Sequence, residues 1–437
     1  MALGRGAGRC RASTSRGQIR HARLAGRSID RPVAACRHPG CRAGDEARTK
    51  LERQGLPVKS TRTTGSWPSP RTSRMFGHLP RWTGNSLALI EEGARLGPVF
   101  SLQLWRPAVV GYSPDWNRLV LGDAAGFRSG GSLSQLSPYL SGGVVALDAP
   151  AHRGRRALMN PAFHRRDIAA RFAEPLQELI DRSMPSGDFD ASQWSSALMQ
   201  NMIQEVFVGK SFPEKVLHNF LKPLDTPMPG PLLRRPFKIR RMQSALRTAL
   251  NEADPTTLAP LFGSLEGGVE EARVAIAAAY DTTAHTLAFA LWELAARPDL
   301  RVPELAESVV QETLRLYPAG WIGSRVATND TEFKGRTIPA GMLILYSPYL
   351  THRDPELWRN PLHFSPERFS DPLPPWGYIP FSAGERTCLG AALASLTLQT
   401  AVKAFADRSL TRVNGDGSPR GGLTLAPKGP LVLTRGS

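Results

Sequence analysis

Apolar residues recur at helical spacing through residues 152–316, a pattern that predicts a long series of α-helices. A proline-rich stretch at 223–236 interrupts this series. Residues 274–296 are apolar on nearly every side, so this segment is expected to be a helix buried at the centre of the fold. A last helical pattern covers 389–406 and predicts a helix that begins close to Cys388. The hydrophobic pattern therefore indicates a mainly α-helical protein.

Shorter apolar runs bounded by glycine and proline predict small peripheral β-sheets. Two strands are expected around the Arg106-Pro107 turn, and Ser113 is expected to begin a helix that runs to Leu121. The segment 127–145 is rich in glycine and serine and is expected to be a long loop. The expected strand segments are 97–105, 108–112, 334–341 with a turn, and 423–434 as a hairpin.

The positive charge of the chain is concentrated at its N-terminal end. The 437 residues carry a formal net charge of +17, and residues 1–74 hold 17 Lys and Arg against 4 Asp and Glu, a net of +13. The rest of the chain has a net charge of only +4, and no base-stacking aromatic motif accompanies the basic segment. We therefore expect no nucleic-acid partner.

Residues 1–75 are expected to form a disordered basic tail ahead of a single domain at 76–437. The tail is rich in arginine and poor in acids, as in a transit peptide, and a misassigned upstream start codon would look the same. Its cysteines, Cys10, Cys36 and Cys41, fit no trusted metal-site spacing. No apolar run of transmembrane length and no secretory signal is evident. We expect a cytoplasmic protein without a transmembrane anchor, with organelle targeting as the alternative.

The fourth cysteine lies in the sequence Phe381-Ser-Ala-Gly384-Glu-Arg386-Thr-Cys388-Leu-Gly390, just before the last predicted helix. A helix N-terminus stabilises an anion, so the thiolate form of Cys388 is expected to be favoured. Gly384 and Gly390 have no Cβ, so backbone or a flat ligand can approach closely. A thiolate in this setting suits the axial ligand of a haem iron, and the alternative is an inert buried cysteine.

The pattern Phe-x-x-Gly-x-Arg-x-Cys-x-Gly resembles the haem-binding loop of the cytochrome P450 superfamily. Three further motifs occur in the family's order, namely Asp281-Thr282-Thr283, Glu312-Thr-Leu-Arg315 and Pro366-Glu367-Arg368-Phe369. The resemblance covers residues 76–437 and implies that this segment is a cytochrome P450 catalytic domain. The implied fold is mainly α, a helical bundle around haem b with small peripheral β-sheets.

The resemblance also implies which residues hold the cofactor. Haem propionates need charge-assisted donors, and His152 and Arg156 resemble the bacterial form of the family's propionate-binding helix. Taken singly, each of these two is as readily explained as a solvated helix residue. The implied cofactor-binding residues are His152, Arg156, Arg325, Phe381, Gly384, Arg386, Cys388 and Gly390, with Cys388 as the metal ligand.

Asp281 and Thr282 interrupt the apolar segment 274–296 with an acid and a hydroxyl. A buried acid is costly unless it is paired or hydrogen-bonded. The resemblance implies that this pair is catalytic, lying over the iron and helping to deliver protons to dioxygen. The local alternative is a Thr282 hydroxyl that bonds the Ala278 carbonyl one turn back. Ala279 stands where the family more often has glycine, which slightly narrows the groove for dioxygen.

Glu312 and Arg315 are three residues apart and share one face of a predicted helix, and Arg368 follows in a loop. Surface pairs at this spacing are common, so the pair alone is a weak signal. The resemblance implies that the three side chains form a structural cluster behind the cysteine loop. Such a cluster requires full mutual pairing in a water-poor site.

Two regions depart from the family pattern. The segment 213–250 is shorter than expected, and few residues separate Leu300 from Val302-Pro303-Glu304, where the family usually has another helix. These losses could reduce the lid of the substrate pocket or destabilise the fold.

The resemblance implies a haem-thiolate monooxygenase that inserts one oxygen atom from O2 into a hydrophobic small molecule. A terpenoid or another secondary metabolite is favoured, because Gly320-Trp321-Ile322 and 346–355 are reminiscent of actinobacterial members that oxidise terpenes. No Gly-x-Gly-x-x-Gly fingerprint is present, so electrons are expected from a separate ferredoxin or flavoprotein. The alternatives are a peroxide-using haem enzyme and a non-catalytic protein that binds haem or a hydrophobic ligand.

Overall fold

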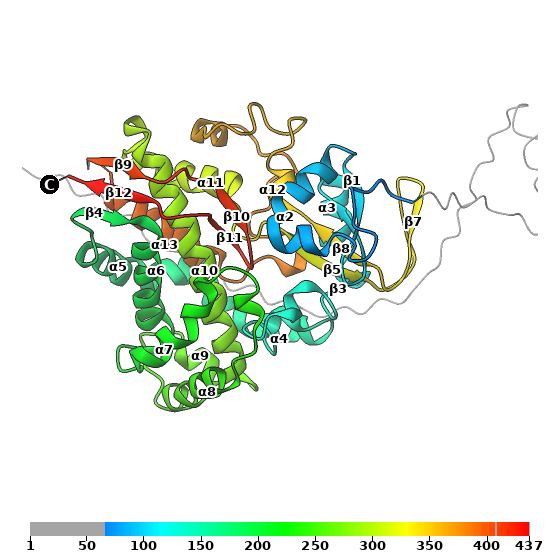
Figure 1. The fold of residues 1–437 in the computed structure, drawn as a ribbon. Coiled ribbons are helices and arrows are strands. Elements are labelled where there is room, and N and C mark those ends of the chain that lie inside the picture. Colours follow the sequence, from blue (N-terminus) through cyan, green and yellow to red (C-terminus); the bar gives the residue numbers. More distant parts are fainter. Residues whose placement is uncertain (1–65, 407–408, 437) are drawn as a thin grey trace, which may run out of the picture. The chain divides into compact units, whose positions relative to one another are not determined.

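The computed structural model describes residues 66–406 and 409–436 (Figure 1). The predicted tail up to residue 65, with its three cysteines, lies outside the described residues. All described residues belong to one unit that spans 62–437. This unit is mainly helical with four small sheets among the described residues, so the predicted fold class is confirmed.

Local sequence signals set several helix boundaries. Ser113 accepts a hydrogen bond from the Trp116 N–H and caps the next helix, as predicted. The proline-rich stretch 223–236 forms two 3-10 turns, and a helix begins at Pro236, where a missing N–H costs no intrahelical bond. The α-helices are α2 (Leu79–Ala94), α3 (Pro114–Gly122), α4 (Ala151–Met159), α5 (Arg165–Arg182), α6 (Ala191–Ile203), α7 (Glu214–Leu221), α8 (Pro236–Asn251), α9 (Ala259–Gly263), α10 (Gly268–Ala295), α11 (Ala306–Leu316), α12 (Pro348–Thr351) and α13 (Ala391–Ala404).

The central helix expected at 274–296 is α10, which packs against α6, α8 and α13 (Figure 1). Leu287, Phe289 and Leu291 have no exposed surface, so this helix contributes strongly to the hydrophobic core. By length and composition α10 could cross a membrane, contrary to the expectation from the sequence. Most of its apolar window is buried inside the protein, as in a core helix.

The largest sheet has five strands in the order β1-β2-β8-β5-β3 (Figure 1). Its first two strands are those predicted on either side of the Arg106-Pro107 turn, and they pair with Phe100 opposite Val110. β2 and β8 are parallel, and the other pairs are antiparallel. The strands are β1 (Val99–Gln103), β2 (Pro107–Gly111), β3 (Phe127–Arg128), β5 (Gly323–Ala327) and β8 (Leu343–Tyr346).

The hairpin predicted at 423–434 is wrong, because its two halves belong to different sheets. β11 (Leu425–Pro427) pairs with β10 (Pro419–Gly421), whereas β12 (Val432–Arg435) pairs with β4 (Gly187–Asp190) and β9 (Leu410–Asn414). Pro427 ends β11 and Pro430 lies between the two strands, and both lack the N–H groups that a hairpin ladder would use.

The strand and turn predicted at 334–341 are confirmed in a two-stranded hairpin of β6 (Thr331–Phe333) and β7 (Arg336–Ile338). Lys334 and Gly335 both have positive φ angles at the tip, +46° and +74°. This backbone suits glycine at the second position and allows the tight turn.

Residues 66–75, predicted as part of the tail, pack on the five-stranded sheet and α2. The Ser101 N–H donates to the Pro68 carbonyl at 2.8 Å, and the Arg336 guanidinium stacks 4.8 Å from the centre of the Trp67 ring. The Arg71 N–H also donates to Glu92 at 3.0 Å. The folded part of the chain therefore begins before the predicted boundary at residue 76.

The two shortened regions retain regular structure. Residues 213–250 contain α7, the two 3-10 turns and most of α8. Between α10 and α11 the chain makes only two single 3-10 turns, Pro298–Leu300 and Pro303–Leu305. The expectation of a missing helix at this point is therefore confirmed.

Candidate functional site

Cys388 lies at the end of a tight loop, just before α13. Its backbone N–H donates to the Phe381 carbonyl at 2.8 Å and closes the loop. Gly384 has a φ of +68°, and an added Cβ would lie 2.2 Å from the carbonyl oxygen of Leu121, so the loop requires glycine there. At Gly390 an added Cβ would meet no protein atom within 4 Å. Protein packing therefore does not demand this second glycine, which leaves space beside the sulfur.

The Cys388 side chain keeps accessible surface although protein surrounds it. Burial raises the pKa of its thiol, and the Gly390 N–H and the Arg156 guanidinium act in the opposite direction. The helix N-terminus was expected to favour the thiolate, but here desolvation is the larger effect. A metal cation at the sulfur would reverse this balance, because a coordinating thiol is deprotonated. The sulfur therefore combines accessible surface with surroundings that disfavour its charge.

The four predicted basic residues gather close to this loop. Burial, followed by the positive charges of Arg386 and Arg156, lowers the pKa of His152 to about 4. Arg325 contributes in the same direction, and it also lowers the pKa of Arg386. The structure thus brings together basic side chains from three separate segments of the chain, and their like charges repel one another.

Little negative charge offsets this basic group among the described residues. Asp148 lies 3.2 Å from Arg386, whereas Glu385 is paired with the exposed Arg153 at 2.6 Å. The Nε atoms of Arg156 and Arg386 are buried and make no hydrogen bond. A buried donor without an acceptor is costly, so these atoms fit a ligand that supplies carboxylates. The two propionates of a haem match this donor set.

One face of α10 keeps accessible surface, although most of the rest of the helix is buried. From residue 271 to residue 295, the residues that keep more than a small accessible surface are Ala275, Ala278, Ala279 and Thr282. Their spacing of three and four residues places them on a single helix face. α10 packs against α13, the helix that follows Cys388. The small side chains of α10 and the cysteine that precedes α13 thus keep accessible surface on neighbouring elements.

Asp281 and Thr282 lie side by side in the sequence at this part of α10 but make different contacts. Thr282 Oγ1 donates to the Ala278 carbonyl at 2.7 Å, which is the local arrangement that the sequence left open. Asp281 is only 2% exposed, and its Oδ2 accepts a hydrogen bond from Thr424 Oγ1 at 2.7 Å. Burial raises the pKa of Asp281, and the nearby His285 and Thr424 oppose that shift.

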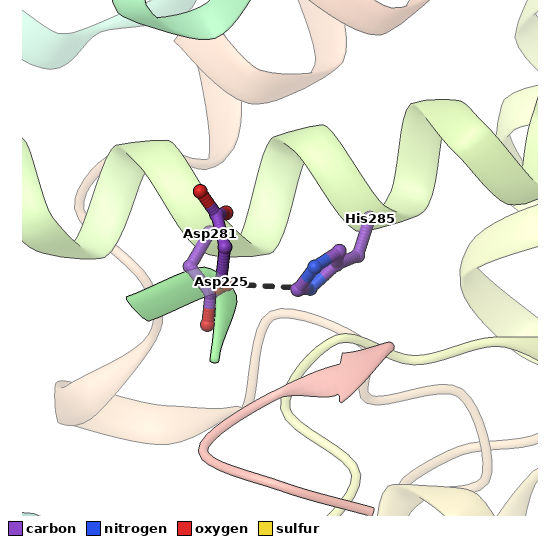
Figure 2. Close-up of side chains that lie close together, drawn as sticks. All are labelled: Asp225, Asp281 and His285. Carbon is purple, nitrogen blue, oxygen red and sulfur yellow. Dashed lines mark ion pairs between the residues drawn. The ribbon is translucent and has the colours of Figure 1, made fainter. Parts of the chain in front are cut away.

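Figure 2 shows that Asp225 and His285 lie beside Asp281. One potential ligand atom from each of the three side chains lies within 4.8 Å of the others. These groups are engaged in hydrogen bonds, since Tyr280 donates to Asp225 at 2.8 Å and Thr424 connects Asp281 to His285. We therefore interpret the cluster as a hydrogen-bonded network and not as a set of metal ligands.

The predicted cluster of Glu312, Arg315 and Arg368 is present. Arg315 makes a bidentate contact with Glu312 at 2.7 and 2.9 Å, and Arg368 Nε lies 3.2 Å from the same carboxylate. Glu312 and Arg315 have no exposed surface. Arg315 also donates to the carbonyls of His352 and Pro361, so its charge is fully hydrogen-bonded, as a buried ion pair requires.

Two residues that the sequence analysis did not select connect this cluster to the cysteine loop. His352 contacts the Arg315 carbonyl through Nδ1 and the Ile379 N–H through Nε2, at 3.1 and 2.9 Å. Tyr378 donates to the Gln311 carbonyl at 2.9 Å. These bonds use backbone partners far away in the sequence, so no local motif could have revealed them.

Comparison with known proteins agrees with this arrangement. A sequence profile described as Cytochrome P450 matches residues 304–406. The chain is 25% identical over 420 aligned residues to Cyclooctat-9-en-7-ol 5-monooxygenase of Streptomyces melanosporofaciens, covering 82% of this chain and 91% of that protein. It is 26% identical to Cyclooctatin synthase of the same organism, covering 78% and 86%. Human Cytochrome P450 3A7 is 34% identical over 190 residues, covering 36% and 38%.

The profile match contains both the Glu312 cluster and the Cys388 loop, and the two bacterial relatives align along most of the chain. The mainly helical fold agrees with this assignment. The chain therefore resembles the cytochrome P450 family, whose profile matches residues 304–406, and its similarity to a bacterial monooxygenase along most of its length indicates an oxidoreductase of that type.

Proposed function

We propose that this chain binds haem b with Cys388 as the axial ligand and oxidises a hydrophobic small molecule, with terpenoids as the favoured class. The observation that carries the proposal is Cys388, whose side chain keeps accessible surface close to four basic residues that have little negative charge to neutralise them. When bound, the haem iron would supply dioxygen activation, with thiolate donation favouring O–O cleavage.

Each site residue has a role that its surroundings support. His152, Arg156, Arg325 and Arg386 would hold the propionates, because two of their buried Nε atoms need acceptors. Gly390 leaves room for a flat ligand. Phe381, at the start of the same loop, packs against the main hydrophobic core. The cluster of Glu312, Arg315 and Arg368 would fix the loop that presents Cys388. Thr282, on the small-residue face of α10, and the neighbouring buried Asp281 would hold and transfer protons.

The small apolar side chains on the accessible face of α10 indicate the class of substrate. Its alanines offer only methyl groups, so apolar surface on a ligand would be buried there at a gain of ~25 cal/mol per Å². The name of one bacterial relative gives cyclooctat-9-en-7-ol, an unsaturated alcohol, as the compound on which that protein acts. A terpenoid substrate for this chain agrees with both points.

The electrons are proposed to come from a separate ferredoxin or flavoprotein. The sequence contains no Gly-x-Gly-x-x-Gly fingerprint, which supports an external nicotinamide- or flavin-dependent donor. The acid and hydroxyl of Asp281 and Thr282 support the use of dioxygen over peroxide, since peroxide already carries the protons that such a pair would deliver.

The test is the absorption spectrum of the reduced carbon monoxide complex. The wild-type protein should give the thiolate-type band, and Cys388→His should keep some haem but lose that band. Replacement of the three tail cysteines by alanine is the matched control and should leave the spectrum unchanged. An unchanged band in Cys388→His would rule out Cys388 as the ligand. A screen of hydrophobic ligands by their Soret shift would then identify the substrate class.

A further inference from the structure

A chain of polar groups connects the buried Asp281 to the surface of the protein. Asp281 and His285 are 2% and 9% exposed, whereas Asp225, from the 3-10 turn Lys222–Asp225, is exposed. Thr424, which directly precedes β11, lies between the two buried groups. The proton-transfer role proposed for Asp281 leaves open how this enclosed carboxyl exchanges protons with water.

The directions of the hydrogen bonds follow from the chemistry of the three groups. An ionised carboxylate can only accept, so the single hydroxyl proton of Thr424 goes to Asp281 Oδ2, at 2.7 Å. The Thr424 oxygen lies 3.0 Å from His285 Nδ1 and must accept a proton from it. His285 therefore carries hydrogen on Nδ1. Two successive hydrogen bonds thus point from the imidazole toward the buried acid.

Asp225 forms the outer end of this path (Figure 2). Its carboxylate accepts from Tyr280 at 2.8 Å and lies within 4.8 Å of ligand atoms of both Asp281 and His285. Among the described residues no direct hydrogen bond joins Asp225 to Asp281 or His285, and a separation within this limit leaves room for one bridging water molecule. Because Asp225 is exposed, it can take its proton from solvent.

The acidities of these groups suit proton transfer. Loss of solvation around each carboxyl raises the pKa of Asp225 and of Asp281, so both hold a proton more readily than a free aspartic acid, although Asp225 as a residue keeps exposed surface. Arg420, from β10, faces Asp281 and lowers its pKa in partial compensation. Tyr280 remains protonated, since burial and the negative charge of Asp225 raise its pKa.

Asp281 Oδ1 is buried and accepts no hydrogen bond. His285 Nδ1 lies 3.3 Å from this oxygen but directs its hydrogen to Thr424. A network that served only to stabilise the fold would be expected to satisfy both carboxylate oxygens. The open acceptor leaves Asp281 with a free lone pair that can take up a proton.

We propose that Asp225, His285 and Thr424 form a relay that carries protons from solvent to Asp281, next to Thr282. A proton enters at Asp225, reaches the His285 imidazole through water, and Nδ1 releases its own proton to Thr424, which passes a proton to Asp281. Only protons move: the incoming proton binds Nε2, so each passage leaves the ring with hydrogen on Nε2, and exchange with water returns it to the Nδ1 form before the next proton. The use of these protons rests on the proposed monooxygenase function, but the relay itself does not.

The direct test follows the protonation of Asp281 without turnover. In the haem-loaded enzyme, the infrared band of the Asp281 carboxyl is assigned by its absence in Asp281→Asn. After a light-triggered proton release, the rate at which this band appears should fall at least roughly tenfold in His285→Asn, Thr424→Val and Asp225→Asn. Asp371→Asn, which removes an exposed acid outside the network, is the matched control and should keep the wild-type rate.

Two variants separate the relay from a purely structural network. Asparagine at 285 retains an N–H donor near the position of Nδ1 but cannot shuttle a proton, so His285→Asn should preserve stability and still slow protonation. Thr424→Ser keeps the hydroxyl and should restore the rate lost in Thr424→Val. A wild-type rate in both His285→Asn and Thr424→Val would overturn the relay, as would a Thr424→Ser variant as slow as Thr424→Val.

The proposed function can fail independently of this result. Absence of the thiolate-type carbon monoxide band in the wild type would reject the proposed ligation, whereas the infrared rates would still decide whether the relay exists. If both hold, product formed per electron should fall in His285→Asn and Thr424→Val while the carbon monoxide spectrum stays unchanged. Unchanged coupling together with slowed protonation would mean that Asp281 receives its catalytic protons by another path, which would also overturn the proposed role.

Discussion

The backbone N–H of Ile379 donates a hydrogen bond to Nε2 of His352 at 2.9 Å. Because this nitrogen accepts, the ring carries its proton on Nδ1, which donates to the Arg315 carbonyl at 3.1 Å. His352 has no exposed surface. Its ring therefore couples the helix that bears the Glu312 cluster to the segment that leads into the cysteine loop, and it does so only while it is neutral.

This bond predicts a pH dependence of stability. Burial, followed by the positive charge of Arg315, lowers the pKa of His352 to about 3. Between pH 6.5 and 3 the unfolded chain therefore binds a proton that the folded protein excludes. The contribution of His352 should be complete above that window and decline as pH falls, by up to roughly 1.4 kcal/mol per pH unit.

The measurement is the free energy of unfolding in urea between pH 7 and pH 4, for the wild type and His352→Gln. The variant should be less stable at pH 7 because it cannot make both bonds. It should also lose the part of the pH slope that belongs to this residue. Parallel curves for the two proteins would contradict the assignment.

The buried ion pair predicts a large difference between two similar substitutions. Glu312→Gln leaves the Arg315 and Arg368 charges without their carboxylate in a water-poor site, so it should destabilise the protein by about 3–5 kcal/mol. Glu385→Gln breaks the exposed pair with Arg153 and should cost less than about 1 kcal/mol. Denaturant unfolding of both variants gives the comparison. Equal costs would show that burial does not amplify the Glu312 pairing.

The sequence could reveal those parts of the site whose chemistry is carried by short motifs. Cys388 with its two glycines, and the Glu312–Arg315 spacing, both identify themselves locally. His352 and Thr424 could not be found in this way, because their partners are backbone groups or side chains more than twenty residues away. The same limit applies to the fold, where α10 followed from its apolar pattern but the pairing of β11 and β12 depended on distant strands.

The contacts of residues 66–74 predict that two truncations will differ. Removal of residues 1–65 retains the Pro68 bond to Ser101 and the stacking of Arg336 on Trp67, whereas removal of 1–74 eliminates both. The longer deletion should lower the thermal midpoint relative to the shorter one. The melting temperatures of the two purified proteins, together with their haem content, decide the matter. Identical midpoints would mean that this segment adds no stability to the sheet.

Thr282 either bends the helix or delivers protons, and one substitution can distinguish these two roles. Its hydroxyl donates to the Ala278 carbonyl at 2.7 Å, which alone would make it a helix-bending residue. It also lies on the accessible face of α10 and follows the buried Asp281 in the sequence, so its hydroxyl could pass on a proton. Thr282→Val is nearly isosteric, so the fold should be kept, with a stability change of about 0.5–1.5 kcal/mol for the lost bond.

If Thr282 takes part in proton delivery, product formed per electron should fall sharply in Thr282→Val, since general acid catalysis of this kind contributes roughly 10²–10⁴ in rate. Consumption of reductant should continue, and the electrons should leave as free hydrogen peroxide. Thr282→Ser, which retains the hydroxyl, is the control and should stay close to the wild type. Simultaneous assay of product, peroxide and reductant measures the partition. If Thr282→Val is less stable but forms as much product per electron as the wild type, the hydroxyl serves only the Ala278 carbonyl, and protons reach the site from Asp281 without it.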